Sequence, residues 1–141
     1  MNDPFHLQRF VDAQNPVYGN VLEELRAGCK RSHWMWFIFP QLAGLGSSSM
    51  ARKFGISSLK EAEAYLNHEV LGFRLRECSA LAVQINDRTA HQIFGDPDDM
   101  KFRSCMTLFA RTTQDNQVFQ EALLKYFAGA PDPRTQAALE L

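Results

Sequence analysis

The sequence has no excess of charge of either sign. Among its 141 residues, 15 lysines and arginines are matched by 16 aspartates and glutamates, for a formal net charge of -1. Without an overall positive field, general binding to nucleic acid or to an anionic membrane is not expected. The chain is not a polar, disordered one either, because hydrophobic residues make up 45% of it and charged residues 22%.

Cysteine is scarce. The three cysteines, Cys29, Cys78 and Cys105, are an odd number and have no CxxC spacing. This pattern argues against a disulfide framework and against a structural zinc site. We therefore predict no metal and no cofactor, and a reducing compartment, the cytoplasm, suits free thiols.

Long hydrophobic runs are also absent. The longest one, from Trp34 to Phe39, is far shorter than the ~20 residues of a membrane-spanning helix. The opening MNDPFHLQRF lacks the basic start and the apolar stretch of a secretion signal. We expect a soluble cytoplasmic protein without a membrane span.

Local signals throughout the chain favour short helices. Apolar residues recur with a period near 3.6 over residues 17–25, 71–85 and 119–127. Four Asx-Pro pairs are typical of helix starts, with an N-cap side chain before a proline: Asp3-Pro4, Asn15-Pro16, Asp96-Pro97 and Asp132-Pro133. With no repeat or long linker, residues 1–141 are predicted to form one all-α domain, a compact bundle of about eight short helices.

The most distinctive segment runs from His33 to Gln41. It carries two tryptophans and two phenylalanines, and its context favours a buried helical turn. Core packing explains most of these rings. Trp34 or Trp36 could instead present its face to a base or a sugar ring.

A glycine- and serine-rich stretch follows directly and includes Gly44, Gly46 and Ser48. A loop of this kind, next to basic residues such as Lys30, can present backbone N–H groups to a phosphate or a carboxylate. Its spacing is neither that of a P-loop nor GxGxxG, so a plain surface loop is the alternative.

A third polar cluster lies in DPDDMKFRSCMTLF, residues 96–109. On a helix, Asp99, Arg103 and Thr107 would share one face. Lys101 and Ser104 add further polar groups to this short stretch. A well-capped, solvated helix explains the same pattern without a ligand.

These stretches together resemble a bacterial and fungal family of proteins with a domain of unknown function, number 1810. The matching motifs are a DPFxLxRFVxAQ-like opening (3–14), KxSHWMWFxFPQLxGLGxS (30–48), LGxRLxEC (71–78), IFGxxDxxKxxSxMTLF (93–109) and a closing DxxT near Thr135. The resemblance implies a compact, mostly helical fold and no settled activity. It marks as shared Lys30, His33, Trp34, Trp36, Gln41, Gly44, Gly46, Ser48, Arg74, Asp99, Lys101, Ser104 and Thr107. Cys105 departs from the small polar residue expected there.

Members of that family are often labelled calpastatin. Calpastatin is a disordered inhibitor that folds on its protease, whereas this chain has the apolar content of a packed domain. We therefore reject that function for the chain.

Two functional hypotheses remain. In the first, the protein binds or processes a small anionic ligand of nucleotide or ADP-ribose type. Its ligand-binding candidates are Lys30, Trp34, Trp36, Gln41, Gly44, Gly46, Ser48, Lys101, Arg103 and Ser104, and its candidates for proton transfer are His33 and Asp99. This hypothesis predicts that Lys30, His33, Gln41, Asp99 and Arg103 line one cleft.

In the second hypothesis the protein is a non-enzymatic interaction or structural module with an unknown protein partner. The aromatic residues are then core, and the polar clusters are helix caps and surface pairs. The sequence is compatible with an enzyme and with a binding module alike.

Overall fold

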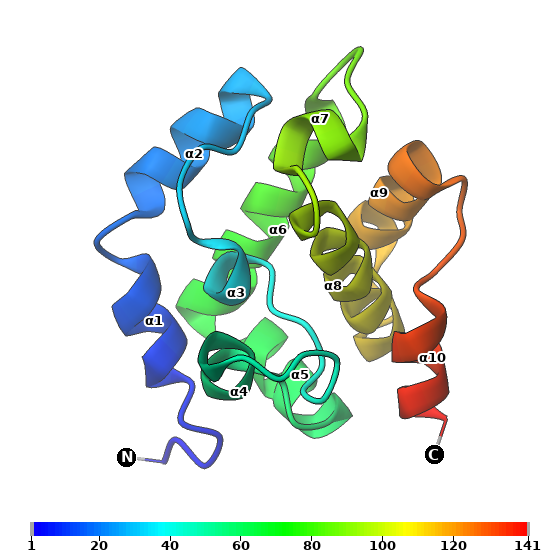
Figure 1. The fold of residues 1–141 in the computed structure, drawn as a ribbon. Coiled ribbons are helices and arrows are strands. Elements are labelled where there is room, and N and C mark those ends of the chain that lie inside the picture. Colours follow the sequence, from blue (N-terminus) through cyan, green and yellow to red (C-terminus); the bar gives the residue numbers. More distant parts are fainter. Residues whose placement is uncertain (1, 141) are drawn as a thin grey trace.

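Two helices, α6 (Glu69–Gln84) and α8 (Asp98–Thr112), run through the middle of the molecule (Figure 1). The structure is a computed structural model that describes residues 2–140. In this part of the chain there are no strands, and the other helices are α1 (Gln8–Gln14), α2 (Tyr18–Ala27), α3 (Met35–Ile38), α4 (Ser49–Phe54), α5 (Leu59–Asn67), α7 (Ala90–Phe94), α9 (Gln117–Phe127) and α10 (Pro133–Leu139). The predicted all-α class is confirmed, with ten helices in residues 2–140 where about eight were expected.

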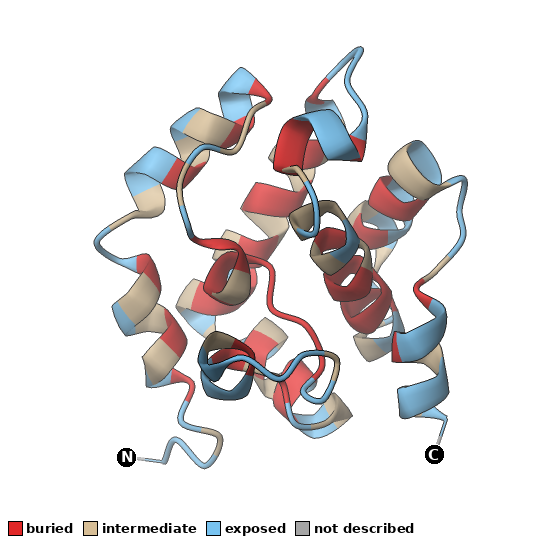
Figure 2. Cartoon of the chain, viewed as in Figure 1, coloured by how far each residue is buried: buried red, intermediate tan, exposed pale blue. Residues whose placement is uncertain are grey.

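The remaining helices surround this central pair. Helix α6 contacts α2, α5 and α9, while α8 contacts α5, α7, α9 and α10. Figure 2 shows buried residues along α6 and α8 and on the segment that follows α3, with exposed residues on the outer faces of the bundle. The buried apolar side chains form one continuous core cluster.

The predicted apolar periodicities are confirmed. Helix α6 buries Leu71, Leu75, Cys78 and Ala82 on one stripe. Helices α2 and α9 bury Leu25 and Phe119, whereas Val17 and Phe127, at the ends of the predicted stretches, are only partly buried. The 3.6-residue period therefore identified which face of each helix meets the core.

The aromatic segment forms the predicted buried turn, α3, and then continues as buried irregular chain. The ring of Phe39 packs edge-on against Phe102 of α8 and against Phe94 of α7. The distances between ring centroids are 4.9 and 6.0 Å. Edge-to-face pairs of this kind add to the free energy gained by burying the rings. They tie the chain that follows α3 to the start of α8.

Of the four predicted Asx-Pro helix starts, only Asp132-Pro133 has the expected geometry. The Asp132 side chain accepts a hydrogen bond from the backbone N–H of Thr135, and the proline follows it at the start of α10. Asn15 is instead the C-cap of α1, and α8 begins at Asp98 after a cis Asp96-Pro97 bond. A local cap signal does not specify which neighbouring residue starts the helix, because tertiary contacts shift the boundary.

Helices α5 and α6 approach each other closely at Gly72. A Cβ atom at this position would lie 2.0 Å from the backbone oxygen of Leu66, so only glycine fits.

Within residues 2–140, no helix has the length and apolar character needed to cross a membrane.

Candidate functional site

A surface pocket of about 340 Å³ lies between α3, the loop that joins α3 to α4, the start of α8 and the start of α10. Its size falls within the range of small-molecule sites. We call it the α8–α10 pocket. It is lined by Trp36, Gln41, Leu45, Gly46, Pro97, Met100, Lys101, Ser104, Asp132 and Arg134.

Gln41 is held in the pocket wall by its backbone. The N–H of Ile56 donates to the Gln41 carbonyl at 2.9 Å, and the N–H of Ala43 donates to the Ile56 carbonyl at 2.8 Å. The residue is 9% exposed, and its side-chain amide has no hydrogen-bond partner among residues 2–140. This amide therefore meets solvent only through the pocket.

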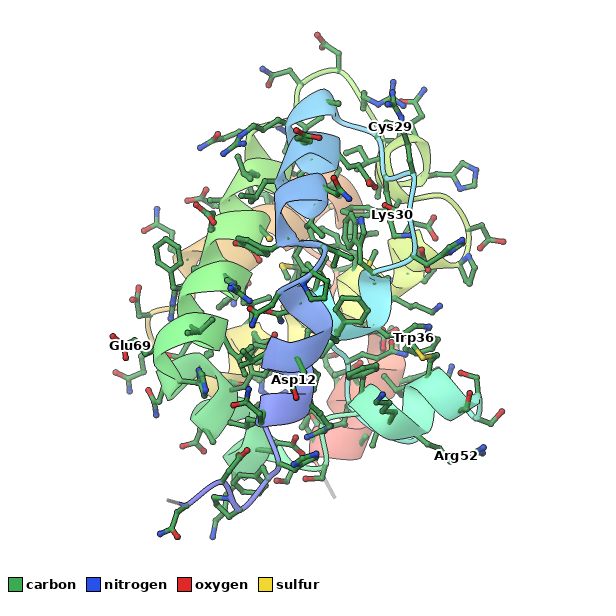
Figure 3. The ribbon with its side chains drawn as sticks, turned by 90° about the vertical axis from the view of Figure 1, so that its left-hand side faces the viewer. Asp12, Cys29, Lys30, Trp36, Arg52 and Glu69 are labelled. Carbon is green, nitrogen blue, oxygen red and sulfur yellow. The ribbon has the colours of Figure 1, made fainter. Side chains whose placement is uncertain are left out.

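Lys101 brings a positive charge to the opposite wall. Its ammonium group lies 3.9 Å from the ring centroid of Trp36, a cation–π contact, and 3.2 Å from a carboxylate oxygen of Asp98. The other oxygen of Asp98 pairs with Lys30 at 2.8 Å. Figure 3 shows Lys30 on the segment that leads into α3 and Trp36 on α3 itself. Because Lys101 has one carboxylate neighbour and three N–H donors, it keeps donors for a ligand.

Helix α10 supplies the third wall through a capping network. One carboxylate oxygen of Asp132, Oδ2, accepts from the backbone N–H and the hydroxyl of Thr135, at 3.0 and 2.6 Å. The Ser104 hydroxyl lies 3.2 Å from the same oxygen, and the backbone N–H of Asp132 donates to the Thr107 hydroxyl at 2.8 Å. These contacts attach α10 to α8.

Arg134, the second residue of α10, completes the wall. Its guanidinium donates to the backbone carbonyl of Leu45 at 3.1 Å, so it connects α10 to the loop between α3 and α4. The side chain is otherwise exposed, and a guanidinium carries five N–H donors. Lys101 and Arg134 therefore bring two positive charges from different helices to one pocket.

Comparison with known proteins identifies the family. The model of a family described as a protein of unknown function, DUF1810, matches residues 4–139. The chain belongs to this family. A search of curated proteins gives no match.

A crystal structure of a DUF1810-like chain is known. The conserved hypothetical protein Rv1873 from Mycobacterium tuberculosis is 60% identical to this chain, covers 99% of it with 99% of its own length, and superimposes with a TM-score of 0.98. The DUF1810 fold is thus shared along the whole alignment, and neither the description of the family nor that of Rv1873 states an activity.

Five of the residues that sequence reasoning proposed for ligand binding line the α8–α10 pocket of this DUF1810 protein. They are Trp36, Gln41, Gly46, Lys101 and Ser104. They come from two motifs far apart in the sequence, the aromatic segment and the start of α8. The fold thus brings the two motifs together.

The other basic and aromatic candidates have different surroundings. Trp34 is 1% exposed and its indole N–H donates to Glu24 at 3.0 Å, so it has no free face for a ligand. The Lys30 ammonium is buried against Asp98. Arg103 donates to the carbonyl of Ala130 at 3.0 Å and does not line the pocket.

The two residues proposed for proton transfer also lie outside the pocket. His33 is exposed on the segment before α3. The carboxylate of Asp99 accepts from the backbone N–H of Met100 at 2.8 Å and lies 3.5 Å from His91. Lys30, His33, Gln41, Asp99 and Arg103 therefore do not line one cleft, because α8 turns Asp99 and Arg103 away from Gln41.

The loop candidates divide in the same way. Gly44 is exposed and has a φ of 92°, which a side chain would disfavour, but it does not line the pocket. The Ser48 hydroxyl accepts from the backbone N–H of Ala51 at 3.1 Å and caps α4. Thr107, expected on a polar face, is buried, and its hydroxyl accepts a hydrogen bond from the backbone N–H of Asp132 at the start of α10.

Sequence reasoning missed Asp132 and Arg134 as pocket residues. The available signal was the DxxT motif, since Asp132 and Thr135 are its two named positions. It also missed Glu24, which holds the segment leading into α3. Within residues 2–140, no group of three or more His, Cys, Asp or Glu side chains is placed to hold a metal ion.

Glu24 is the most strongly perturbed carboxylate near the aromatic segment. It accepts from the backbone N–H groups of Arg31 and Ser32, from the Ser32 hydroxyl and from the Trp34 indole. Burial opposes its ionisation, but these hydrogen bonds outweigh burial and lower its pKa to about 2. Glu24 thus orients the chain that carries Trp36 into the pocket.

Proposed function

We propose that this protein binds a small anionic ligand in the α8–α10 pocket. The observation that carries the proposal is the convergence of Lys101 and Arg134 on a pocket that also exposes the unpaired amide of Gln41. Cationic groups and a few oriented polar groups against an apolar wall are the usual composition of a small-ligand site. Trp36 and Met100 provide the apolar wall.

The proposal concerns binding and assigns no chemistry to the pocket. His33 and Asp99, the residues expected to move protons, do not line it. Its volume of about 340 Å³ lies at the lower end of the usual range, which favours a compound of mononucleotide size over ADP-ribose.

Cellular setting is part of the same proposal. The free cysteines, two of them buried, support a reducing compartment such as the cytoplasm. The net charge of -1 supports a small ligand over nucleic acid in general. The mycobacterial relative supports a bacterial origin.

A thermal-shift panel tests the proposal with nucleotides, ADP-ribose, sugar phosphates and small carboxylates. At a hundredfold excess over Kd, a ligand should raise the Tm by roughly 5 to 10 °C. Lys101→Ala and Arg134→Ala should each remove most of this response because they remove the cations of the pocket.

Matched controls come from exposed basic residues outside the pocket. Arg26→Ala on α2 and Lys60→Ala on α5 remove the same charge and should keep the wild-type response. A panel without any response, or equal losses in all four variants, would contradict the proposal.

The interaction module remains the second candidate. Phe73 and Leu124 are 64% and 68% exposed on α6 and α9, which is unusual for such large apolar side chains. Scattered exposed apolar residues are nevertheless common on monomers, so this observation is the weaker of the two.

A further inference from the structure

One oxygen of the Asp132 carboxylate accepts hydrogen bonds from neighbouring residues, and the other accepts none from residues 2–140. All three donors that surround it, the N–H and hydroxyl of Thr135 and the hydroxyl of Ser104, lie at Oδ2. Among residues 2–140, Oδ1 has no hydrogen-bond donor. Asp132 is 7% exposed and lines the α8–α10 pocket, so its remaining access to solvent is through that pocket.

Gln41 presents a second unpaired polar group to the same space. It is 9% exposed, and the hydrogen bond from the Ile56 N–H to the Gln41 carbonyl fixes the position of its backbone in the pocket wall. Buried polar groups normally have hydrogen-bond partners. An amide both donates and accepts, so it suits a hydroxyl group of a ligand.

The charges restrict the ligand further. Lys101 and Arg134 attract an anion, but the Asp132 carboxylate repels one and accepts hydrogen bonds only. A bare anion such as inorganic phosphate therefore satisfies the cations and leaves Asp132 and Gln41 unpaired. A ligand that meets all four residues carries an anionic group at one end and hydroxyl donors at the other.

We propose that the ligand is a phosphorylated sugar of pentose or hexose size, an inference that rests on the proposed function. Its phosphate contacts Lys101 and Arg134, and its hydroxyls donate to Asp132 Oδ1 and pair with the amide of Gln41. The apolar side chains of Trp36 and Met100 face the C–H side of the sugar ring. The volume of about 340 Å³ suits a ligand of this size.

Titration calorimetry with simple probes tests the sugar directly. Ribose 5-phosphate should bind at least about tenfold more tightly than methyl phosphate, which has no hydroxyl, because hydrogen bonds to a charged acceptor are strong. Ribose without phosphate should bind weakly. Equal affinities for ribose 5-phosphate and methyl phosphate would overturn the assignment to a sugar while leaving the proposed function intact.

Two outcomes separate the sugar from other possibilities. If no phosphate compound binds but a small carboxylate does, the sugar phosphate is overturned and the proposed function stands; if no anion of either kind binds, the proposed function fails as well. Adenosine 5′-monophosphate carries the same sugar phosphate, so its binding together with that of ribose 5-phosphate supports the assignment. Binding of the nucleotide without any binding of ribose 5-phosphate would overturn it.

Asp132→Asn converts the acceptor in the pocket into a donor. The donors around Oδ2 require the asparagine carbonyl at that position, so its NH₂ group takes the place of Oδ1. Asparagine and aspartate cap helices equally well, so the Tm should stay close to that of the wild type. Ribose 5-phosphate should lose its roughly tenfold advantage, and methyl phosphate should bind more tightly than to the wild type.

The matched control is Asp12→Asn, which removes a charge from the exposed face of α1 and should leave both affinities unchanged. If Asp132→Asn fails to fold, Gln41→Met serves instead. The Gln41 amide makes no hydrogen bond to residues 2–140, so this change should preserve the fold and weaken only ribose 5-phosphate. An unchanged preference in both pocket variants would overturn the proposal.

Discussion

At the scale of single residues, Glu24 has a larger structural role than its position on the surface of α2 suggests. Its carboxylate collects four hydrogen bonds from the segment that leads into α3. Exposed carboxylates seldom stabilise a fold. A carboxylate that accepts hydrogen bonds from several N–H and O–H groups stabilises it when ionised. The position of Trp36 at the pocket thus depends on a residue ten or more positions earlier in the chain.

This arrangement predicts a pH-dependent stability. The pKa of Glu24 in the folded protein, about 2, is below its ordinary value of 4.5. Ionised Glu24 therefore stabilises the fold fully above pH 4.5, and that stabilisation is lost as the pH falls from 4.5 to about 2. Glu24→Gln should lower the free energy of unfolding by about 1 to 3 kcal/mol at neutral pH, and by less below pH ~4.

Urea denaturation at several pH values measures this effect. Glu23→Gln, on the same helix but exposed, is the matched control and should change stability by less than about 0.5 kcal/mol. A destabilisation by Glu24→Gln that is the same at neutral and at acidic pH would show that the charge is not responsible.

The two tryptophans mark the limit of sequence reasoning at this scale. Trp34 and Trp36 are two residues apart, and both were candidates for stacking on a ligand. Only the structure separates them, since Trp34 is 1% exposed and bonded to Glu24, whereas Trp36 lines the pocket. A single helical turn is too short to have a readable periodicity.

At the scale of helices, some glycines lie where two helices touch and others lie next to open space. At Gly72 a Cβ atom would meet the backbone of Leu66 at 2.0 Å, whereas at Gly19 on α2 it would meet nothing within 4 Å. Gly72→Ala should therefore lower the free energy of unfolding by about 3 kcal/mol or more, because α5 and α6 must move apart. Gly19→Ala should raise it by about 0.5 to 1 kcal/mol, because alanine favours the helix.

Thermal and urea denaturation of both variants measure these opposite changes, and each variant is the control for the other. If both changes stabilise the protein, the contact between the two helices is looser than the structure describes. The glycine in the LGxRLxEC motif would then need another explanation.

Helix α10 also determines the pocket at this scale. Its start is held by Ser104 and Thr107 of α8, two positions that the family resemblance marked as shared. The shared residues of α8 therefore serve partly to attach a helix, and that helix carries Asp132 and Arg134. A signal read as possible ligand binding was in part a packing signal.

At the scale of the whole molecule, the core determines which thiols can react. Burial raises the pKa of Cys78 to about 12 and the pKa of Cys105 well above its usual range. Cys29 is only partly buried. Iodoacetamide should therefore modify Cys29 in the native protein and reach Cys78 and Cys105 only after unfolding.

Intact-mass spectrometry with and without urea measures the number of modified thiols. One modification in buffer and three in denaturant are expected, with Cys29 identified by peptide mapping. Modification of Cys78 or Cys105 in buffer at the rate of Cys29 would contradict the burial of α6 and α8 in the core.

The sequence by itself determined the helical class, the buried faces of α2, α6 and α9, and the two motifs that border the pocket. These features are local, because hydrophobic period and cap residues act over one or two helical turns. It also placed Lys101 and Gln41 in one candidate ligand site, together with residues such as Asp99 and Arg103 that do not line the pocket.

Only the tertiary structure decided which candidates form the pocket. Gln41 and Lys101 are brought to Asp132 and Arg134 by the packing of α3, α8 and α10, and that packing depends on contacts between residues far apart in the chain. The direction of each α8 side chain around the helix also decided that Lys101 faces the pocket while Asp99 and Arg103 do not. Sequence spacing predicts which residues share a face of a helix, but only the neighbouring helices decide what that face meets.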